Sequence, residues 1–191
     1  MSKRLAIFDF DGTLVKQDSF ELMIWHNHSI FKISHAVYLF IVPYFFSMGN
    51  QEKRGLLKEK IFSFFFKGYS AAQFETACKK ITPYLLRGER VEILRQLKRC
   101  VEENYITAIV SASMPNWIAP WARQYQVAYI IGTTPAFEGD FLTGKFSSPN
   151  CNGPEKVRRI KNEILGLADF EEILAFGNSE GDSEMLKLQT K

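Results

Sequence analysis

The stretch Leu5–Thr13 (LAIFDFDGT) decides the fold. Its first six residues form a short apolar run, and Asp11-Gly12-Thr13 ends that run with residues typical of a turn. We therefore expect a buried strand that stops at a turn and begins a sheet. Because side chains alternate along a strand, Asp9 and Asp11 should leave it on the same side, with Phe10 pointing away. Two carboxylates would then converge at the end of this strand.

Helical and strand patterns alternate along the second part of the chain. Apolar residues recur at helical spacing from Val91 to Glu103, and Tyr105–Val110 (YITAIV) follows as a buried strand. A second helix is expected from Gly153 to Leu165, with Ile173–Phe176 (ILAF) as the strand after it. This alternation predicts a parallel α/β sheet. The segments in between are predicted to form a further strand and a hairpin, at Tyr129–Ile131 and Ala136–Phe146.

The segment of residues 16–87 differs from the rest of the chain. It holds all three histidines and ten of the 17 phenylalanines, and it lacks the alternation of strands and turns. We expect a separate helical insert here, which leaves residues 1–15 and 88–191 as the core. The most apolar part of the insert, Ala36–Phe46, is 11 residues long and contains Pro43. A helix needs about 20 residues to cross a bilayer, so no transmembrane helix is expected.

Composition narrows the class of protein. A length of 191 residues favours one core with a modest insert, and the net charge of +3 is too small and too dispersed to predict nucleic-acid binding. The three cysteines, Cys78, Cys100 and Cys151, match neither a disulfide framework nor a zinc site. The apolar run after the N-terminus is too short for a signal peptide, so a cytoplasmic location is expected.

Further polar residues follow the later strands. Ser111 ends the Tyr105–Val110 strand, Lys156 lies in the first turn of the expected helix, and Gly177–Ser183 (GNSEGDS) follows the last strand. Taken singly, these residues also fit a strand-end hydroxyl, a solvated lysine and a turn. Taken in order with Asp9 and Asp11, they resemble the haloacid dehalogenase (HAD) superfamily of phosphohydrolases, over the whole α/β part of the chain. The resemblance implies a Rossmann-like, three-layer parallel sheet with an inserted helical cap.

The same resemblance implies a role for each motif residue. Asp9 would be the nucleophile that forms an aspartyl-phosphate, and Asp11 the general acid and then base. Ser111 and Lys156 would contact the phosphoryl oxygens and offset their charge. A magnesium ion would lie among oxygen ligands. The remaining implied residues are Gly12, Thr13, Ala112 and Ser113 at the substrate, and Asp9, Asp11, Asn178 and Asp182 at Mg²⁺.

One position departs from the family pattern. The resemblance leads us to expect Gly-Asp-Ser, whereas this chain has Gly177-Asn178-Ser179. An Asn side chain can bind Mg²⁺ through its carbonyl oxygen, but the loss of a negative charge should weaken that binding. The sequence therefore allows two interpretations. One is an active phosphomonoesterase, and the other is a weakly active phosphate-binding or membrane-surface protein.

The insert is expected to act as a cap that selects the substrate. Its placement is similar to the branch, subfamily IB, that includes phosphoserine phosphatase, and residues 151–157 (CNGPEKV) are similar to the bacterial phosphatidylglycerophosphatase C group. The density of aromatic residues makes a lipid phosphate as plausible a substrate as a small metabolite phosphate. It also predicts peripheral membrane contact through the cap, unless these side chains only fill a helical core. The residues do not indicate an oligomeric state.

Overall fold

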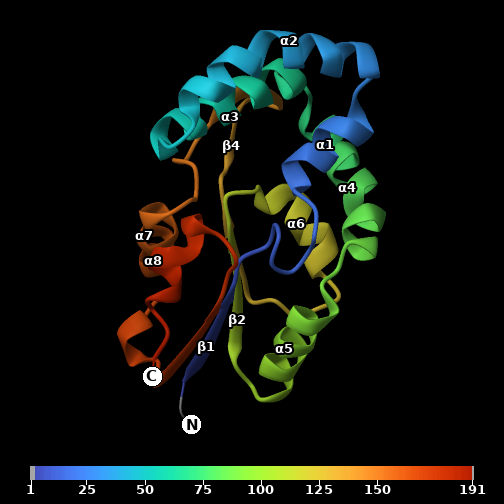
Figure 1. Ribbon diagram of the computed structural model, residues 1–191. Coiled ribbons are helices and arrows are strands. Elements are labelled where there is room, and N and C mark those ends of the chain that lie inside the picture. The colour runs from blue at the N-terminus through green and yellow to red at the C-terminus, as the bar shows by residue number, and fades with distance from the viewer. Residues whose placement is uncertain (1–2, 191) are drawn as a thin grey trace.

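The computed structural model describes residues 3–190, and its main sheet has four parallel strands (Figure 1). The strand order is β3-β2-β1-β6, and each neighbouring pair is parallel. The expected parallel α/β sheet is therefore confirmed. The strands are β1 (Arg4–Phe8), β2 (Ile106–Ser111), β3 (Tyr129–Gly132) and β6 (Glu172–Phe176).

Helices cover both faces of this sheet and complete the three layers. The predicted helices are present as α5 (Val91–Glu102) and α7 (Pro154–Glu163), and they lie on opposite faces with α6 (Pro115–Ala122) and α8 (Ser183–Leu186). Alternate residues of β1 enter different clusters: Ala6 and Phe8 pack with the residues of α5 and α6, and Leu5 and Ile7 with those of α7 and α8. Two short 3₁₀ turns, Leu167–Asp169 and Glu180–Asp182, flank β6.

The first strand is shorter than the sequence predicts. It ends at Phe8, although the N–H of Asp9 still donates to the carbonyl oxygen of Phe176 at 2.8 Å. The chain then turns so tightly that the N–H groups of Thr13, Leu14 and Val15 all donate to the carbonyl of Phe10. The prediction that strand alternation directs Asp9 and Asp11 was therefore wrong. The turn after β1 places them instead.

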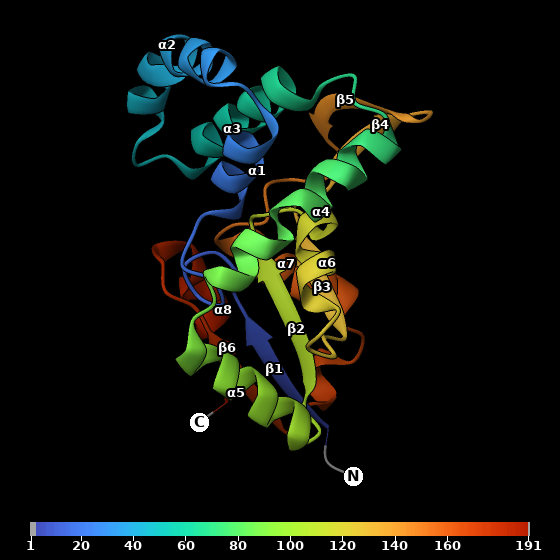
Figure 2. The same ribbon diagram turned by 90° about the vertical axis from the view of Figure 1, so that its right-hand side faces the viewer.

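The insert folds into four helices, α1 (Ser19–Asn27), α2 (Ile30–Ser47), α3 (Gln51–Phe66) and α4 (Ala71–Arg87). Each begins after a side chain that accepts a hydrogen bond from a free backbone N–H, namely Asp18, Ser29, Asn50 and Ser70. The carboxyl ends of the sheet strands point toward these helices, and both termini lie at the opposite end (Figure 2). The insert therefore lies over the edge of the sheet where α/β proteins bind ligands.

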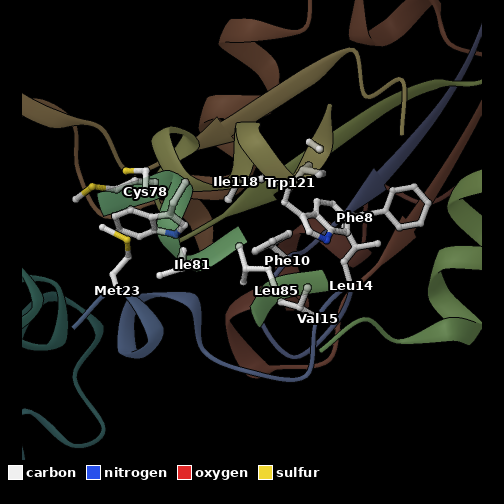
Figure 3. Close-up of a cluster of buried hydrophobic side chains, with 14 of the residues drawn as sticks. Phe8, Phe10, Leu14, Val15, Met23, Cys78, Ile81, Leu85, Ile118 and Trp121 are labelled. Carbon is white, nitrogen blue, oxygen red and sulfur yellow. The ribbon is translucent and has the colours of Figure 1, made fainter. Parts of the chain in front are cut away.

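The insert and the sheet share one buried apolar cluster (Figure 3). Phe10 lies edge-on to Trp121 of α6 with ring centroids 5.0 Å apart, and Ile81 and Leu85 of α4 join the same cluster with Met23 of α1. All five side chains are fully buried. Separation of α1 and α4 from the core would expose this cluster to water, so these two helices are anchored.

The antiparallel hairpin of β4 (Pro135–Glu138) and β5 (Phe141–Phe146) packs against the insert. The N–H of Gly68 donates to the carbonyl of Leu142, and the N–H of Leu142 donates to that of Tyr69, both at 2.8 Å. Phe146 contacts Phe62 of α3 with ring centroids 5.4 Å apart. The predicted boundaries assign this hairpin to the core, whereas its contacts connect it to α3 and to the loop before α4.

Candidate active site

Lys156 lies between two carboxylates at the carboxyl end of the sheet. Its ammonium donates to Asp9 Oδ1 and to Asp182 Oδ1, both at 2.6 Å. The side chains of Lys156, Asp9 and Asp182 are at most 8% exposed. Burial raises the pKa of Asp9, and the Lys156 ammonium opposes that rise. The cluster is therefore a buried cation held by two anions from separate loops.

The N-terminus of α7 places Lys156 at this point. Gly153 begins the helix with φ of 56°, a conformation that favours glycine, and Pro154 takes the first helical position. The N–H of Gly153 donates to the carbonyl of Gly181 at 2.9 Å. This bond joins the start of α7 to the loop after β6, so Lys156 and Asp182 approach each other from connected segments.

Asp182 organises the loop after β6 rather than pointing an open carboxylate at a metal. Its Oδ2 accepts from the N–H groups of Asn178 and Ser179, at 3.1 and 2.9 Å, and from the Ser179 hydroxyl at 2.7 Å. Its Oδ1 is bound to Lys156. Both oxygens are thus occupied, and the Lys156 charge lowers the pKa of Asp182 against the effect of burial.

Asp11 has a different set of partners. Its Oδ2 accepts from the Ser113 hydroxyl, and its Oδ1 accepts from the N–H of Ser19 at 2.8 Å. Burial and the nearby carboxylate of Asp18 raise the pKa of Asp11 to about 7. Asp9 faces a cation and Asp11 faces neutral donors, so the two carboxyl groups have environments suited to different protonation states.

The predicted phosphate-site residues Ser111, Ala112 and Ser113 lie at the end of β2 and on the loop that follows it. The Ser111 hydroxyl accepts from the N–H of Ser113 at 3.0 Å, which fixes the oxygen while leaving its own proton to donate. Ser111 and Ser113 are both 1% exposed. The hydroxyl of Ser113 is engaged with Asp11, and the carbonyl of Ala112 accepts from Thr133 at 2.7 Å. In this arrangement the Ser113 hydroxyl positions Asp11, and its predicted contact with a substrate stays a prediction.

Two residues that the sequence analysis missed support Asp11 through a buried chain of hydrogen bonds. The indole N–H of Trp117 donates to the Ser19 hydroxyl, and that hydroxyl donates to Ser113, both at 2.9 Å. Ser19 and Trp117 are fully buried. The Asp18-Ser19 pair could have been recognised as the start of a helix, but its contact with Trp117 joins segments 98 residues apart.

Lys58 of α3 is the third residue that the sequence analysis missed. Its ammonium donates to the carbonyl of Ala112 at 2.9 Å. This contact brings a positive charge from the insert to the loop after β2, which we call the strand-end loop. Burial lowers the pKa of Lys58, and the carboxylates of Asp18 and Asp11 oppose that effect. A lysine among the many on α3 gives no sequence signal of its own. Its role depends on the way the insert is folded.

Oxygen atoms suitable for Mg²⁺ meet beside Asp9. The Thr13 hydroxyl lies 2.9 Å from Asp9 Oδ2 and 3.0 Å from Asn178 Oδ1, so these two oxygens face the same point. Gly12 has φ of 75°, and a Cβ there would lie 2.5 Å from the Asn178 amide nitrogen, so only glycine allows this approach. The oxygens of Asp9, Thr13 and Asn178 are of the kind that a hard cation binds.

This donor set carries little negative charge. Within residues 3–190, no group of three or more His, Cys, Asp or Glu side chains is arranged to hold a metal ion. The reason lies in the loop after β6, where Asn178 supplies a neutral oxygen and Asp182 is bound to Lys156. The assignment of Asp182 as a direct ligand therefore stays a prediction without support from its contacts.

Removal of the Lys156 charge should destabilise the fold. In Lys156→Met, two buried carboxylates lose their cation, and we expect the free energy of unfolding to fall by about 3–5 kcal/mol. Urea denaturation in the presence of a chelator measures this. Lys161→Met, an exposed position on the same helix, is the matched control and should change stability by less than about 0.5 kcal/mol. Equal stabilities for the two variants would contradict the arrangement.

Comparisons with known proteins identify the family of this chain. Protein CicA of Caulobacter vibrioides is 31% identical over 195 residues, which cover 96% of this chain and 82% of the relative. A protein of unknown function from Bordetella pertussis Tohama I has the same fold, with a TM-score of 0.82 and 20% identity over 100% of this chain and 89% of that one. The structure of a phospho-aspartyl intermediate analogue of phosphoserine phosphatase matches with a TM-score of 0.60 and 19% identity, over 99% of this chain and 84% of that one.

The model of one family also matches nearly the full length of the chain. The haloacid dehalogenase-like hydrolases match residues 6–187, a range that holds Asp9, Asp11, Lys156 and the loop after β6. The resemblance seen in the sequence motifs is thereby confirmed. The chain belongs to the haloacid dehalogenase-like hydrolase family.

Proposed function

We propose that this hydrolase cleaves phosphate monoesters, with Asp9 as the nucleophile and Asp11 as the general acid and base. The observation that carries this proposal is the difference between the two carboxyl groups. Asp9 is paired with Lys156 at 2.6 Å, whereas Asp11 accepts only from Ser113 and Ser19. The Lys156 ammonium favours the ionised form of Asp9, whereas Asp11 has a pKa of about 7 and can carry a proton.

In the first step, an oxygen of Asp9 attacks phosphorus and the bond from phosphorus to the ester oxygen breaks. Asp11 gives its proton to that oxygen, so the product leaves as an alcohol and an aspartyl-phosphate remains. Lys156 and the Ser111 hydroxyl contact the phosphoryl oxygens. The solved structure of a phospho-aspartyl intermediate analogue of phosphoserine phosphatase, which is similar in fold to this chain, supports this kind of intermediate.

In the second step, the ionised Asp11 takes a proton from water as that water attacks phosphorus. The bond between Asp9 and phosphorus breaks, inorganic phosphate leaves, and Asp9 returns as a carboxylate while Asp11 regains its proton. Ser113 and Ser19 keep Asp11 in one orientation through both steps. The same residue thus performs opposite proton transfers from one position, as a pKa close to neutral allows.

Magnesium is proposed as the cofactor. Asp9, Asn178 and the main-chain carbonyl of Asp11 would hold it, and when bound it would neutralise charge on the phosphate. Lys156 alone supplies one positive charge against the two carboxylates that it already pairs with. The phosphate dianion therefore needs additional positive charge, which Mg²⁺ would supply.

Asp9→Asn tests the nucleophile. We expect kcat for an aryl phosphate with Mg²⁺ to fall at least about a thousandfold, because the amide cannot form the covalent intermediate. The control is Asp169→Asn, an exposed aspartate on the core, which should retain wild-type turnover. Circular dichroism checks that both variants are folded. Undiminished turnover in Asp9→Asn would rule out this residue as the nucleophile.

Asn178→Asp tests the metal site. An added carboxylate beside Asp9 should increase the apparent affinity for Mg²⁺ about tenfold or more, because an anionic ligand replaces a neutral one. Calorimetric titration and the Mg²⁺ dependence of turnover measure this affinity.

The second candidate function, a weakly active phosphate-binding protein, rests on the low charge of the present donor set. Phosphate binding without turnover in the wild type would favour it, and turnover would exclude it.

Lys58→Met tests substrate selection by the insert. Lys58 reaches the strand-end loop from α3, so we propose that it binds a second negative group of the substrate beyond the scissile phosphate. The variant should raise KM about tenfold for phosphoserine or a phosphatidylglycerol phosphate, with little effect on an aryl phosphate that carries no charge besides the scissile phosphate. Lys60→Met, exposed on the same helix, is the control. Equal changes for all substrates would exclude this role.

A further inference from the structure

Helix α2 exposes an uncharged apolar surface at the far end of the insert. No Asp, Glu, Lys or Arg occurs between Lys32 and Glu52. The side chains of Phe31, Tyr38 and Phe46 are 84%, 80% and 75% exposed, although residues of their kind usually pack inside a protein. Contiguous apolar surface of this extent marks a place where a protein meets a partner.

The packing of α2 explains why it remains exposed. Only Ile33, Ala36 and Ser47 of this helix are buried, where it lies along α3. The helix also continues through Pro43 and takes in Ile30–His35, so it is longer than the apolar run of the sequence suggested. Its 18 residues, with a mean hydropathy of 1.4, are long and apolar enough to cross a membrane by length and composition. In the fold, however, it lies flat across the outer end of the insert (Figure 1).

An apolar groove continues this surface between α1, α2 and α3. It has a volume of about 310 Å³, and Glu21 is the one charged residue among those that line it. The apolar residues of its walls include Ile24 and Trp25 of α1, Val37, Phe40 and Ile41 of α2, and Ile61 of α3. The Trp25 side chain is 55% exposed at this groove. A groove with such walls offers hydrocarbon contact and few hydrogen-bond partners, which suits an acyl chain.

Charge is distributed unevenly between the insert and the rest of the chain. Residues 16–87 contain ten Lys and Arg against five Asp and Glu, a net charge of +5, whereas the remaining residues contain fourteen against sixteen, a net charge of −2. The apolar helix is therefore part of the basic portion of the protein. A partner that is apolar at its centre and anionic at its surface would satisfy both features.

We propose that α2 and the adjacent groove dock the insert onto the surface of an anionic lipid bilayer, with α2 lying in the plane of the interface. A second copy of the chain fits less well, because every residue of 37–46 except Phe40 is exposed, whereas a helix seam covers a single stripe. Tyr38, Tyr44 and Trp25 supply the amphipathic aromatic rings that favour the interface. This proposal is independent of the proposed catalytic chemistry.

The test uses the full chain and vesicles of phosphatidylcholine with or without phosphatidylglycerol. We expect flotation with the anionic vesicles, weaker flotation with neutral ones, and weakening by salt, because the basic insert faces the lipid. The Tyr38→Glu/Phe46→Glu variant should lower the apparent affinity at least about tenfold. Leu165→Glu, at an 85% exposed position on the core, is the matched control and should bind as the wild type does.

A fluorescence measurement on the wild type keeps the test independent of variant folding. Trp117 and Trp121 are fully buried, so a blue shift on addition of anionic vesicles would report Trp25 in the groove, and Trp25→Phe should remove it. Absence of flotation and of any shift would overturn the proposal. Equal vesicle binding by the double variant and Leu165→Glu would also overturn it, as would a dimer in light scattering that the double variant dissociates while vesicles remain unbound.

Discussion

The buried cation between two carboxylates is the interaction on which the site depends. Lys156 is 1% exposed, and a charge at that depth is tolerated only with counter-ions in contact, here Asp9 and Asp182 at 2.6 Å. These residues come from the turn after β1, the start of α7 and the loop after β6. One ion cluster therefore fixes three segments relative to each other. A buried lysine without enough counter-ions would cost free energy, which explains why Asp182 is bound to Lys156.

The sheet and its two layers of helices could be predicted from the sequence because buried strands and amphipathic helices leave strong local patterns. Val91–Glu103 and Ile173–Phe176 were expected within one residue of α5 and β6. The end of β1 was misjudged because Asp9 and Phe10 look like a continuation of the apolar run. In fact the carbonyl of Phe10 accepts hydrogen bonds within a tight turn, which local patterning does not reveal.

The sequence predicted which polar residues of the candidate site lie together, but it did not predict their contacts. Asp9, Asp11, Lys156 and the 178–182 loop follow strand ends or start a helix, and the fold brings them to one edge of the sheet. The support of Asp11 by Ser19 and Trp117, and the approach of Lys58 from α3, arise from packing between segments far apart in the chain. Likewise, the sequence showed an apolar segment in the insert, but only the fold shows that α2 is exposed rather than buried.

The insert is tied to the core on one side and open on the other. α1 and α4 share a buried cluster with Phe10 and Trp121, whereas α2 is mostly exposed and α3 carries Lys58 to the strand ends. Substrate selection and surface docking would thus belong to neighbouring helices of one unit. Because the carboxyl ends of the strands face this unit while α2 lies at its outer end, a docked insert would lie between the strand ends and the surface that α2 contacts (Figure 2).

In the proposed reaction, the phosphoryl group is transferred to Asp9 before water receives it. Asp11→Asn should form the aspartyl-phosphate from an activated aryl phosphate, whose leaving group needs no proton, and then hydrolyse it slowly. Acid quenching followed by peptide mass spectrometry would then locate the phosphoryl group. We predict a phosphorylated peptide that contains Asp9. The Asp9→Asn/Asp11→Asn variant is the control and should remain unlabelled. A phosphoryl group on another residue, or turnover that never labels the protein, would contradict it.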